Sequence, residues 1–311
     1  MQKPCLLRRS IIVKDIPMST TTLETLAIIG AGQIGTGIAQ TALTTGFKVI
    51  LIDQSEEQLK IAAENLKDTF ARKLERGQID QASHDGYLAN LQSGIDLSQV
   101  RTANVVIEAV SEIEDAKRSI YKAIAADLRP DAMLATATSS ISITRLGASS
   151  DRPHRFIGMH FMNPVPAMQV VEIIRGIATD DATFELAKAL ADKLGKKPII
   201  AEDFPAFIVN RVLLPMLNEA VYTLYEGVGS VTAIDEAMKL GANHPMGPLE
   251  LADFIGLDTC LSLMHVLYEG LADSKYRPCP LLVKYVEAGW LGRKTGKGFY
   301  DYSQDPPQPT R

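Results

Sequence analysis

Three glycines near the start of the chain constrain the fold more than any other sequence feature. They stand in LAIIGAGQIG (26–35), where a short apolar run ends in Gly30, Gly32 and Gly35 with the spacing G-x-G-x-x-G. The following GIAQTALTTG (37–46) consists largely of small residues that a helix accepts. An apolar run, a glycine-rich turn and a helical stretch predict a strand, a tight turn and a helix in direct succession.

The rest of the first two thirds of the chain repeats this alternation. KVILID (48–53) has the pattern of a second buried strand, and residues 55–77 have that of a long amphipathic helix. Further apolar runs of strand length, with helical stretches between several of them, occupy residues 103–110, 132–138, 155–161, 169–175 and 197–201. The alternation predicts an α/β fold of the Rossmann type, with a doubly wound, mainly parallel sheet.

From Phe204 onward the patterns are helical and no further strand is predicted. We therefore expect a nucleotide-binding domain over residues 23–203 and an all-helical C-terminal domain over 204–311, which would close over the substrate. Its apolar content is generous for one small bundle, so we expect part of that surface to be buried against a partner subunit.

The first 22 residues are expected to form a disordered extension, with Met18 as an alternative start. Arg8, Arg9 and Lys14 leave an organelle presequence open, which would place the protein in the mitochondrial matrix rather than the cytoplasm.

Composition excludes several classes of function. Lys and Arg number 32 against 37 Asp and Glu, a formal charge of -5 that gives no general attraction for nucleic acid or an anionic membrane. Cys5, Cys260 and Cys279 are odd in number and far apart, so neither a disulfide framework nor a metal site is predicted. No apolar run approaches the roughly 20 residues that span a bilayer. We expect a cytoplasmic protein.

The glycine turn has the chemistry of a phosphate cradle. Glycine lets the backbone approach a pyrophosphate, and the helix N-terminus offers free N–H groups and a positive dipole end. Asp53 ends the second strand 18 residues after Gly35, where a carboxylate can bind the ribose hydroxyls of NAD and would repel the extra phosphate of NADP. Two alternatives stay open: a simple turn with Asp53 as a helix cap, and an S-adenosylmethionine methyltransferase.

A histidine and a glutamate interrupt two neighbouring apolar runs. His160 lies in FIGMHF and Glu172 in VVEIIR, joined by a connection with two prolines. If the runs form an antiparallel hairpin centred on Pro166, the two side chains oppose each other on one face. A carboxylate on one imidazole nitrogen fixes the tautomer and leaves the other nitrogen free to take a proton from a hydroxyl. The alternative is a buried histidine whose role is only structural.

With these residues identified, the chain resembles the L-3-hydroxyacyl-CoA dehydrogenase family, and within it the bacterial 3-hydroxybutyryl-CoA dehydrogenases. The resemblance covers residues 24–303 and rests on IGAGQIGTGIAQ, TSSISIT, GMHFMNPVPAMQVVEII, DFPAFIVNRVLLPMLNEA, MKLGANHPMGPLELADFIGLDT and GRKTGKGFYDY. It implies NAD-dependent oxidation of a short-chain L-3-hydroxyacyl-CoA in fatty acid or butanoate metabolism, and a homodimer formed through the C-terminal helical domain.

The resemblance also implies roles for individual residues. His160 would be the general base and Glu172 its partner, while Ser139 and Asn210 would bind the reacting oxygen and the thioester. Thr69 and Arg76 would contact CoA, unless they are only part of a solvated helix face. The NAD neighbours would be Gly30, Ala31, Gly32, Gln33, Ile34, Gly35, Asp53, Glu112, Lys117, Ser139, Asn163 and Lys294. Without the resemblance, Asn210 could equally be a core hydrogen bonder and Ser139 a cap residue.

One position departs from the family pattern. Ala137 stands before Thr138 where the family usually has Asn, and a buried partner of the missing amide would be left unpaired at a cost of about 1 to 3 kcal/mol. The departure keeps open a dehydrogenase of a non-CoA hydroxy acid. A nucleotide-binding structural protein, as among the crystallins of this superfamily, is the alternative outside the enzymes.

Overall fold

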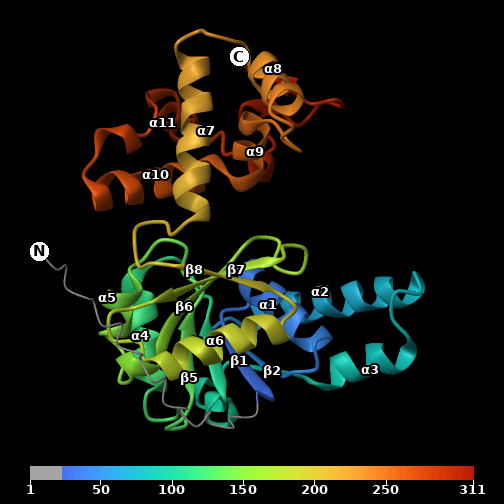
Figure 1. Ribbon diagram of the computed structural model, residues 1–311. Helices are drawn as coiled ribbons and strands as arrows, with labels where there is room; N and C mark the ends of the chain where they lie inside the picture. The colour runs from blue at the N-terminus through green and yellow to red at the C-terminus, as the bar shows by residue number, and fades with distance from the viewer. Residues whose placement is uncertain (1–22) are drawn as a thin grey trace, which may run out of the picture.

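The computed structural model describes residues 23–311. Figure 1 shows an α/β part that contains the sheet and, above it, a helical part, with a short connecting segment between them. The predicted N-terminal extension, including Cys5, lies outside the described residues.

The main sheet within residues 23–311 has eight strands, and its centre is parallel. Across the sheet the strands follow the order β3 (Leu91–Gly94), β2 (Lys48–Ile52), β1 (Thr25–Ile29), β4 (Val105–Glu108), β5 (Met133–Thr136), β6 (Phe156–Phe161), β7 (Val170–Arg175) and β8 (Lys197–Ala201). All neighbours pair in parallel except β6 and β7, which form an antiparallel hairpin. The predicted Rossmann-type, mainly parallel sheet is confirmed. The sequence patterns did not predict β3, whose LQSG is neither apolar nor alternating.

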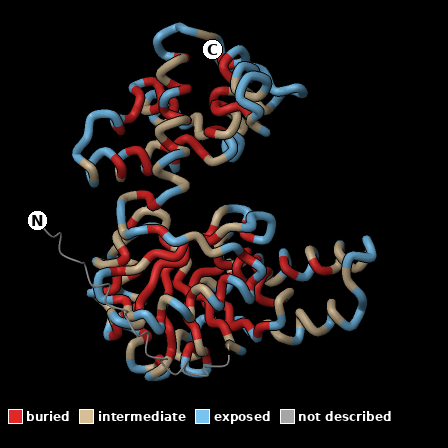
Figure 2. Tube along the Cα trace, viewed as in Figure 1, coloured by how far each residue is buried: buried red, intermediate tan, exposed pale blue. Residues whose placement is uncertain are grey.

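Helices cover both faces of the sheet because successive residues of each strand point to opposite sides. On one face, Leu26 and Ile28 of β1 join the core under α1 (Gln33–Thr44), α2 (Glu56–Glu75) and α6 (Asp181–Lys193). On the other face, Ala27 and Ile29 pack under α4 (Glu114–Ile124) and α5 (Ile143–Gly147). Figure 2 shows the strands as a buried layer between these helices. Helix α3 (Gln81–Ala89) packs on α2, and the two project from the side of the sheet (Figure 1).

The helical part has its own apolar core. Its main helices are α7 (Val209–Tyr225), α8 (Val231–Glu236), α9 (Pro248–Ile255), α10 (Leu257–Leu271) and α11 (Pro280–Glu287). The prediction that no strand follows Phe204 is wrong, because β9 (Tyr300–Asp301) and β10 (Gln308–Pro309) pair antiparallel. Each is two residues long, too short for an alternating pattern to be visible, and β10 lies in the proline-rich tail.

Two buried aspartates hold the end of the chain against the helical part. Asp235 accepts hydrogen bonds from the N–H groups of Leu249 and Glu250 at the start of α9 and from the Tyr300 hydroxyl in the last segment. Asp253 accepts from the N–H groups of Phe299 and Tyr300, and burial raises its pKa to about 6. The last segment is therefore fixed by buried carboxylates that take up otherwise unpaired backbone donors.

The segment that joins the two parts is held at a non-helical turn. Asp203 accepts hydrogen bonds from the Ser142 hydroxyl (2.9 Å) and from the N–H of Thr144 (2.8 Å) at the start of α5. Ala206 and Phe207 then adopt φ angles of 62° and 54°. Residues other than glycine rarely adopt such angles, and each costs on the order of 1 kcal/mol. The surrounding contacts thus fix the direction in which the chain enters α7.

Within residues 23–311, no single helix is long and apolar enough to span a bilayer. Together α9 and α10 reach the required length and composition, but the chain bends by 96° between them.

Candidate active site

The glycine turn forms an open cradle at the N-terminus of α1. Gly30 has a φ of 108°, and a Cβ there would lie 2.5 Å from the Ala109 carbonyl oxygen. A Cβ on Gly35 would lie 1.8 Å from the Gly30 carbonyl oxygen, so both positions exclude any side chain. At Gly32, by contrast, nothing lies within 4 Å of the Cβ position. The free space therefore lies where the backbone would approach a ligand.

The electrostatics of the cradle suit an anion. Gln33, Ile34 and Gly35 form the first turn of α1, whose N–H groups have no partner within the helix. No acidic side chain stands in that turn to compete. Asp53 follows β2 and accepts a hydrogen bond from the N–H of Ala31 (2.8 Å), and a carboxylate has further lone pairs for ribose hydroxyls. The predicted cradle residues thus lie together and fit a dinucleotide with a pyrophosphate.

His160 and Glu172 are directly opposed across the β6–β7 hairpin, as the symmetry about Pro166 predicted. The Nδ1 of His160 donates to Oε2 of Glu172 over 2.6 Å. His160 is 4% exposed and Glu172 is fully buried. Because Nδ1 is engaged, Nε2 is the ring nitrogen left for chemistry.

The other carboxylate oxygen of Glu172 contacts the helical part. Oε1 accepts hydrogen bonds from the N–H groups of Ile208 (2.9 Å) and Val209 (3.0 Å) at the start of α7, a helix that has no side-chain N-cap of its own. Burial alone would raise the pKa of Glu172, but the bond to His160, its charge and the two amides lower the pKa below its ordinary value. The ring of Phe207 lies against the imidazole, with centroids 5.5 Å apart. Glu172 is therefore an ionised carboxylate shared between the histidine and a helix end.

Ser139 and Asn210 flank this pair from the two parts of the molecule. Asn210 is in the first turn of α7, directly after the amides that Glu172 binds. Ser139 follows β5 at the edge of the sheet where the parallel strands end, the edge at which ligands of open α/β sheets bind. Within residues 23–311, neither side chain donates or accepts an intramolecular hydrogen bond, so both remain available to a ligand.

The loop that carries Ser139 is held by Glu112. Its Oε1 accepts hydrogen bonds from the N–H of Ser139 (2.8 Å) and from the Thr138 hydroxyl (2.6 Å). Burial opposes ionisation of Glu112, but nearby Lys117 and these hydrogen bonds lower its pKa below the ordinary value. Lys117 is itself 1% exposed and lies 3.4 Å from Glu112, so the predicted cofactor neighbour Lys117 is buried beneath Glu112.

Sequence reasoning missed the residue on which Lys117 depends. Glu108 is fully buried at the end of β4 and accepts from the Lys117 ammonium (2.7 Å), the Tyr121 hydroxyl (2.7 Å) and the Thr136 hydroxyl (2.7 Å). The sequence contains a signal for Glu108, because it is a glutamate within the apolar run ANVVIEAV, just as Glu172 lies within VVEIIR.

The four remaining predicted ligand neighbours lie on the β6–β7 loop, on the helical part and on α2. Asn163 is exposed in the β6–β7 loop. Lys294 belongs to the helical part, where its ammonium pairs with Asp258 (2.7 Å). Thr69 and Arg76 are on α2 and at its end, on the projecting side of the molecule (Figure 1). Within the described part of the chain, no hydrogen bond or ion pair joins these four residues to His160 or Glu172.

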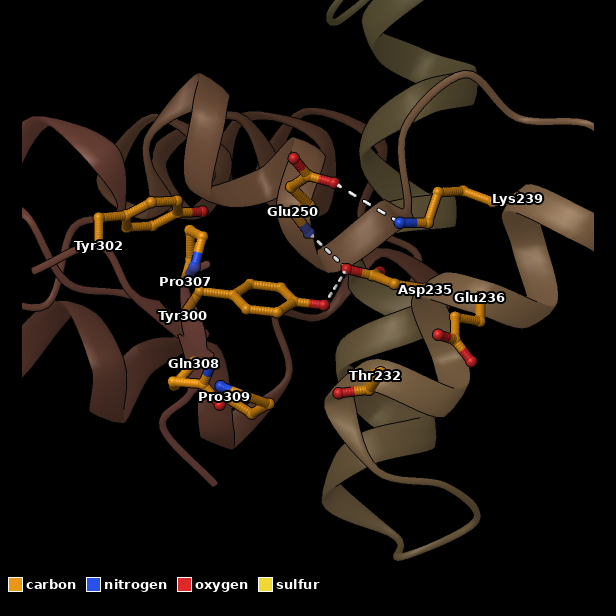
Figure 3. Close-up of a pocket in the computed structure, with 10 residues that line it drawn as sticks. All are labelled: Thr232, Asp235, Glu236, Lys239, Glu250, Tyr300, Tyr302, Pro307, Gln308 and Pro309. Carbon is orange, nitrogen blue, oxygen red and sulfur yellow. Dashed lines mark hydrogen bonds and ion pairs between the residues drawn. The ribbon is translucent and has the colours of Figure 1, made fainter. Parts of the chain in front are cut away.

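A polar cavity lies within the helical part, away from the cradle and from His160. It has a volume of about 350 Å³ and lies between α8, the start of α9 and the chain end. Figure 3 shows Asp235 engaged there by the Tyr300 hydroxyl and the Glu250 N–H. None of the predicted site residues lines this cavity.

A dinucleotide cradle and a buried histidine–carboxylate pair on one sheet are typical of nicotinamide-dependent dehydrogenases. The model of the 3-hydroxyacyl-CoA dehydrogenase NAD-binding domain matches residues 25–204, and that of the 3-hydroxyacyl-CoA dehydrogenase C-terminal domain matches residues 207–302. The chain belongs to the 3-hydroxyacyl-CoA dehydrogenase family and uses NAD. The resemblance found in the sequence is confirmed.

Individual relatives agree with this family. The chain is 60% identical to a 3-hydroxybutyryl-CoA dehydrogenase of Bradyrhizobium diazoefficiens, over 93% of this chain and 99% of the relative. It is 51% identical to a probable 3-hydroxybutyryl-CoA dehydrogenase of Bacillus subtilis, over 91% and 98% of the two chains. The crystal structure of (S)-3-hydroxybutyryl-CoA dehydrogenase PaaH1 from Ralstonia eutropha superimposes with a TM-score of 0.88 and 45% identity, covering 91% of this chain and all of that one.

The surroundings of Ala137 give no sign of a lost partner. Its side chain packs against the apolar core, and its N–H donates to the carbonyl of Glu108 (2.8 Å). Two buried side-chain oxygens in residues 23–311 have no hydrogen-bond donor. They belong to Gln99 and to Asp258, and neither is in the loop of Ser139. The Asp258 oxygen is nevertheless paired, because it lies 2.6 Å from the Lys294 ammonium, whose hydrogen bond goes to the other oxygen of the same carboxylate.

Because no buried polar side chain near position 137 lacks a partner in residues 23–311, an amide added there would have to bind the acyl substrate. We expect Ala137→Asn to raise kcat/KM for that substrate by about two- to tenfold, the worth of one added neutral hydrogen bond. Steady-state kinetics with both substrates measure the change. Ala137→Val, which adds bulk without an amide, serves as the control and should give no gain. Unchanged kcat and both Michaelis constants in the Asn variant would show that position 137 does not limit the reaction.

Proposed function

We propose that this protein catalyses the reversible oxidation of a short-chain L-3-hydroxyacyl-CoA, such as 3-hydroxybutyryl-CoA, to the 3-ketoacyl-CoA. The observation that carries the proposal is the 2.6 Å bond between His160 and the buried Glu172, on the sheet that also bears the dinucleotide cradle. The substrate class follows from the family, and the short acyl chain is supported by the names of the relatives.

In this mechanism His160 is the general base. Its Nε2 takes the proton of the 3-hydroxyl while the C3–H bond breaks and the carbonyl forms. NAD, when bound, supplies the acceptor for the hydride that leaves C3. The carboxylate of Glu172 stabilises the imidazolium that results, since a charge-assisted bond is stronger than a neutral one. In reverse, the protonated Nε2 returns the proton to the ketone oxygen.

Ser139 and Asn210 serve as donors to the reacting oxygen. Their side chains have no intramolecular partner in residues 23–311, so a hydroxyl and an amide are free to bind the oxygen as negative charge develops there. Because Asn210 lies on α7 and Ser139 follows β5, the arrangement is completed only when the helical part stands over the sheet. We infer that movement about the segment around Phe207 closes the site and excludes water.

The CoA and cofactor contacts extend the same proposal. Arg76, an exposed cation at the end of α2, and Thr69 on the same helix would receive the CoA moiety. Asn163 and Lys294 would meet the cofactor, and Lys294 would reach it from the helical part.

His160→Ala should lower kcat by about 10²- to 10⁴-fold, because the general base is removed. Oxidation of NADH with acetoacetyl-CoA, compared with longer ketoacyl-CoAs and free keto acids, gives both the loss and the preferred substrate. NADH affinity, measured by fluorescence, should stay within about twofold since the cradle is untouched. His265→Ala on the exposed face of α10 is the matched control and should keep full activity. Turnover retained by His160→Ala would reject the mechanism.

We also propose that the protein is a homodimer formed through its helical part. Val228 is 75% exposed and lines a mostly apolar groove of about 450 Å³ between α7 and α8. Met238 also lines this groove, and Leu240, two residues further along the chain, is 85% exposed. Exposed apolar groups gathered in this way are typical of an interface. Light scattering after size-exclusion chromatography should give the mass of two chains, and Val228→Glu with Leu240→Glu should give one. A wild-type monomer would contradict this assignment.

A further inference from the structure

A buried lysine without an anionic partner lies beneath the loop that closes the β6–β7 hairpin. Lys196 is 6% exposed, and no ion pair within residues 23–311 includes it. Its ammonium donates instead to two backbone carbonyls of that loop, at Val165 (2.6 Å) and Met168 (2.7 Å). Burial lowers the pKa of this ammonium. A buried cation is expensive without compensation, so the two carbonyls must be essential to its position.

Hydrogen bonds also fix the backbone around Lys196. The α6 helix ends at Lys193, and Gly195, two residues later, turns the chain with a φ of 69°. The N–H of Lys196 donates back to the Ala191 carbonyl (2.9 Å). The next residue, Lys197, donates its N–H to the carbonyl of Gln169 (2.6 Å). The turn from α6 into β8 therefore donates three hydrogen bonds to the loop, two from the Lys196 ammonium and one from the N–H of Lys197.

The supported loop stands at the edge of the sheet that binds ligands. It spans residues 162–169 and begins where β6 ends, at the same edge as the ends of β1 and β4. Its Val165 packs on α1, since a Cβ on Gly37 would lie only 2.9 Å from the Val165 Cβ. The exposed Asn163 is thus held between the first turns of α1 and the strand that carries His160.

We propose that Lys196 is a positioning residue for the cofactor side of the site: it fixes the loop 162–169 from below, so that Asn163 meets the nicotinamide cofactor. This inference rests on the proposed function, in which Asn163 is a cofactor neighbour. Lys196 acts only through the loop backbone and contacts neither substrate nor cofactor.

Lys196→Met replaces the aliphatic stem of lysine with an unbranched apolar side chain of similar length and removes the ammonium donors. We expect the dissociation constant of NADH and the KM for NAD to rise about tenfold, the worth of the lost charge-assisted bonds, while the KM for the acyl substrate stays within about twofold. In the cofactor-free protein, amide hydrogen exchange should become faster in residues 162–169 and stay unchanged in α6 and β8. The exposed neighbour variant Lys197→Met is the control and should match the wild type throughout.

A second variant perturbs the loop from its other side. Gly37→Ala introduces the Cβ that would press on Val165, whereas alanine in a helix is otherwise favourable, so the protein should fold. It should raise the same two cofactor constants and accelerate exchange in the same loop.

Two results would overturn the proposal. One is wild-type NADH affinity and loop exchange in Lys196→Met. The other is faster exchange throughout the sheet, which would make Lys196 a general core residue. Failure of the proposed function can be told apart from failure of this proposal. A wild-type protein without dehydrogenase activity would contradict the proposed function, whereas the effect of Lys196→Met on amide exchange in residues 162–169 could still be measured.

Discussion

The structure depends on the carboxylate of Glu172, which binds both a histidine and the end of a helix. Glu172 is fully buried and bonds His160 through one oxygen and the first amides of α7 through the other. The helix has no side-chain cap of its own, so the carboxylate that orients the histidine also closes the end of the helix that begins the helical part. Removing it would leave an unpaired imidazole and unpaired helix amides in the same apolar place, each a costly defect. His160 and the attachment of the second part of the molecule are therefore supported by the same group.

A second buried glutamate organises the other side of the site. Glu108 neutralises Lys117 at 2.7 Å, and Lys117 in turn faces Glu112, which holds the loop of Ser139. The buried carboxyl groups of Glu108, at the end of β4, and Glu172, near the start of β7, are tolerated only because each accepts several hydrogen bonds. The donors around Glu108 come from a lysine, a tyrosine, a threonine and the N–H of Val110, and those around Glu172 from a histidine and two backbone amides. Rigid polar pairs under the strand ends leave Ser139, Asn210 and Nε2 of His160 free for a substrate.

The cradle and the histidine–glutamate pair could be predicted from the sequence, because the first depends on local glycine spacing and the second on two residues equally distant from the centre of a hairpin. The glycine spacing identifies the cradle, since only glycine fits at Gly30 and Gly35, and the equal distances from Pro166 predict the opposition of His160 and Glu172. The remaining features depend on tertiary contacts that no local pattern encodes. The strand β3 is recruited by pairing with β2, and β10 by pairing with β9. Lys196 looks like an ordinary turn lysine in LGKKP, and its burial follows only from the packing of the β6–β7 loop.

The account rests on the state of one imidazole, which can be observed directly. Nitrogen NMR of the enzyme with labelled histidine, at a pH where the ring is neutral, distinguishes the two tautomers, and the spectrum of His160→Gln assigns the signal among the five histidines. The account predicts that His160 carries its proton on Nδ1, where Glu172 accepts it, and leaves Nε2 bare to receive the substrate proton. In Glu172→Gln the ring should lose this single preference. A wild-type signal dominated by the Nε2–H tautomer would contradict the role given to Glu172.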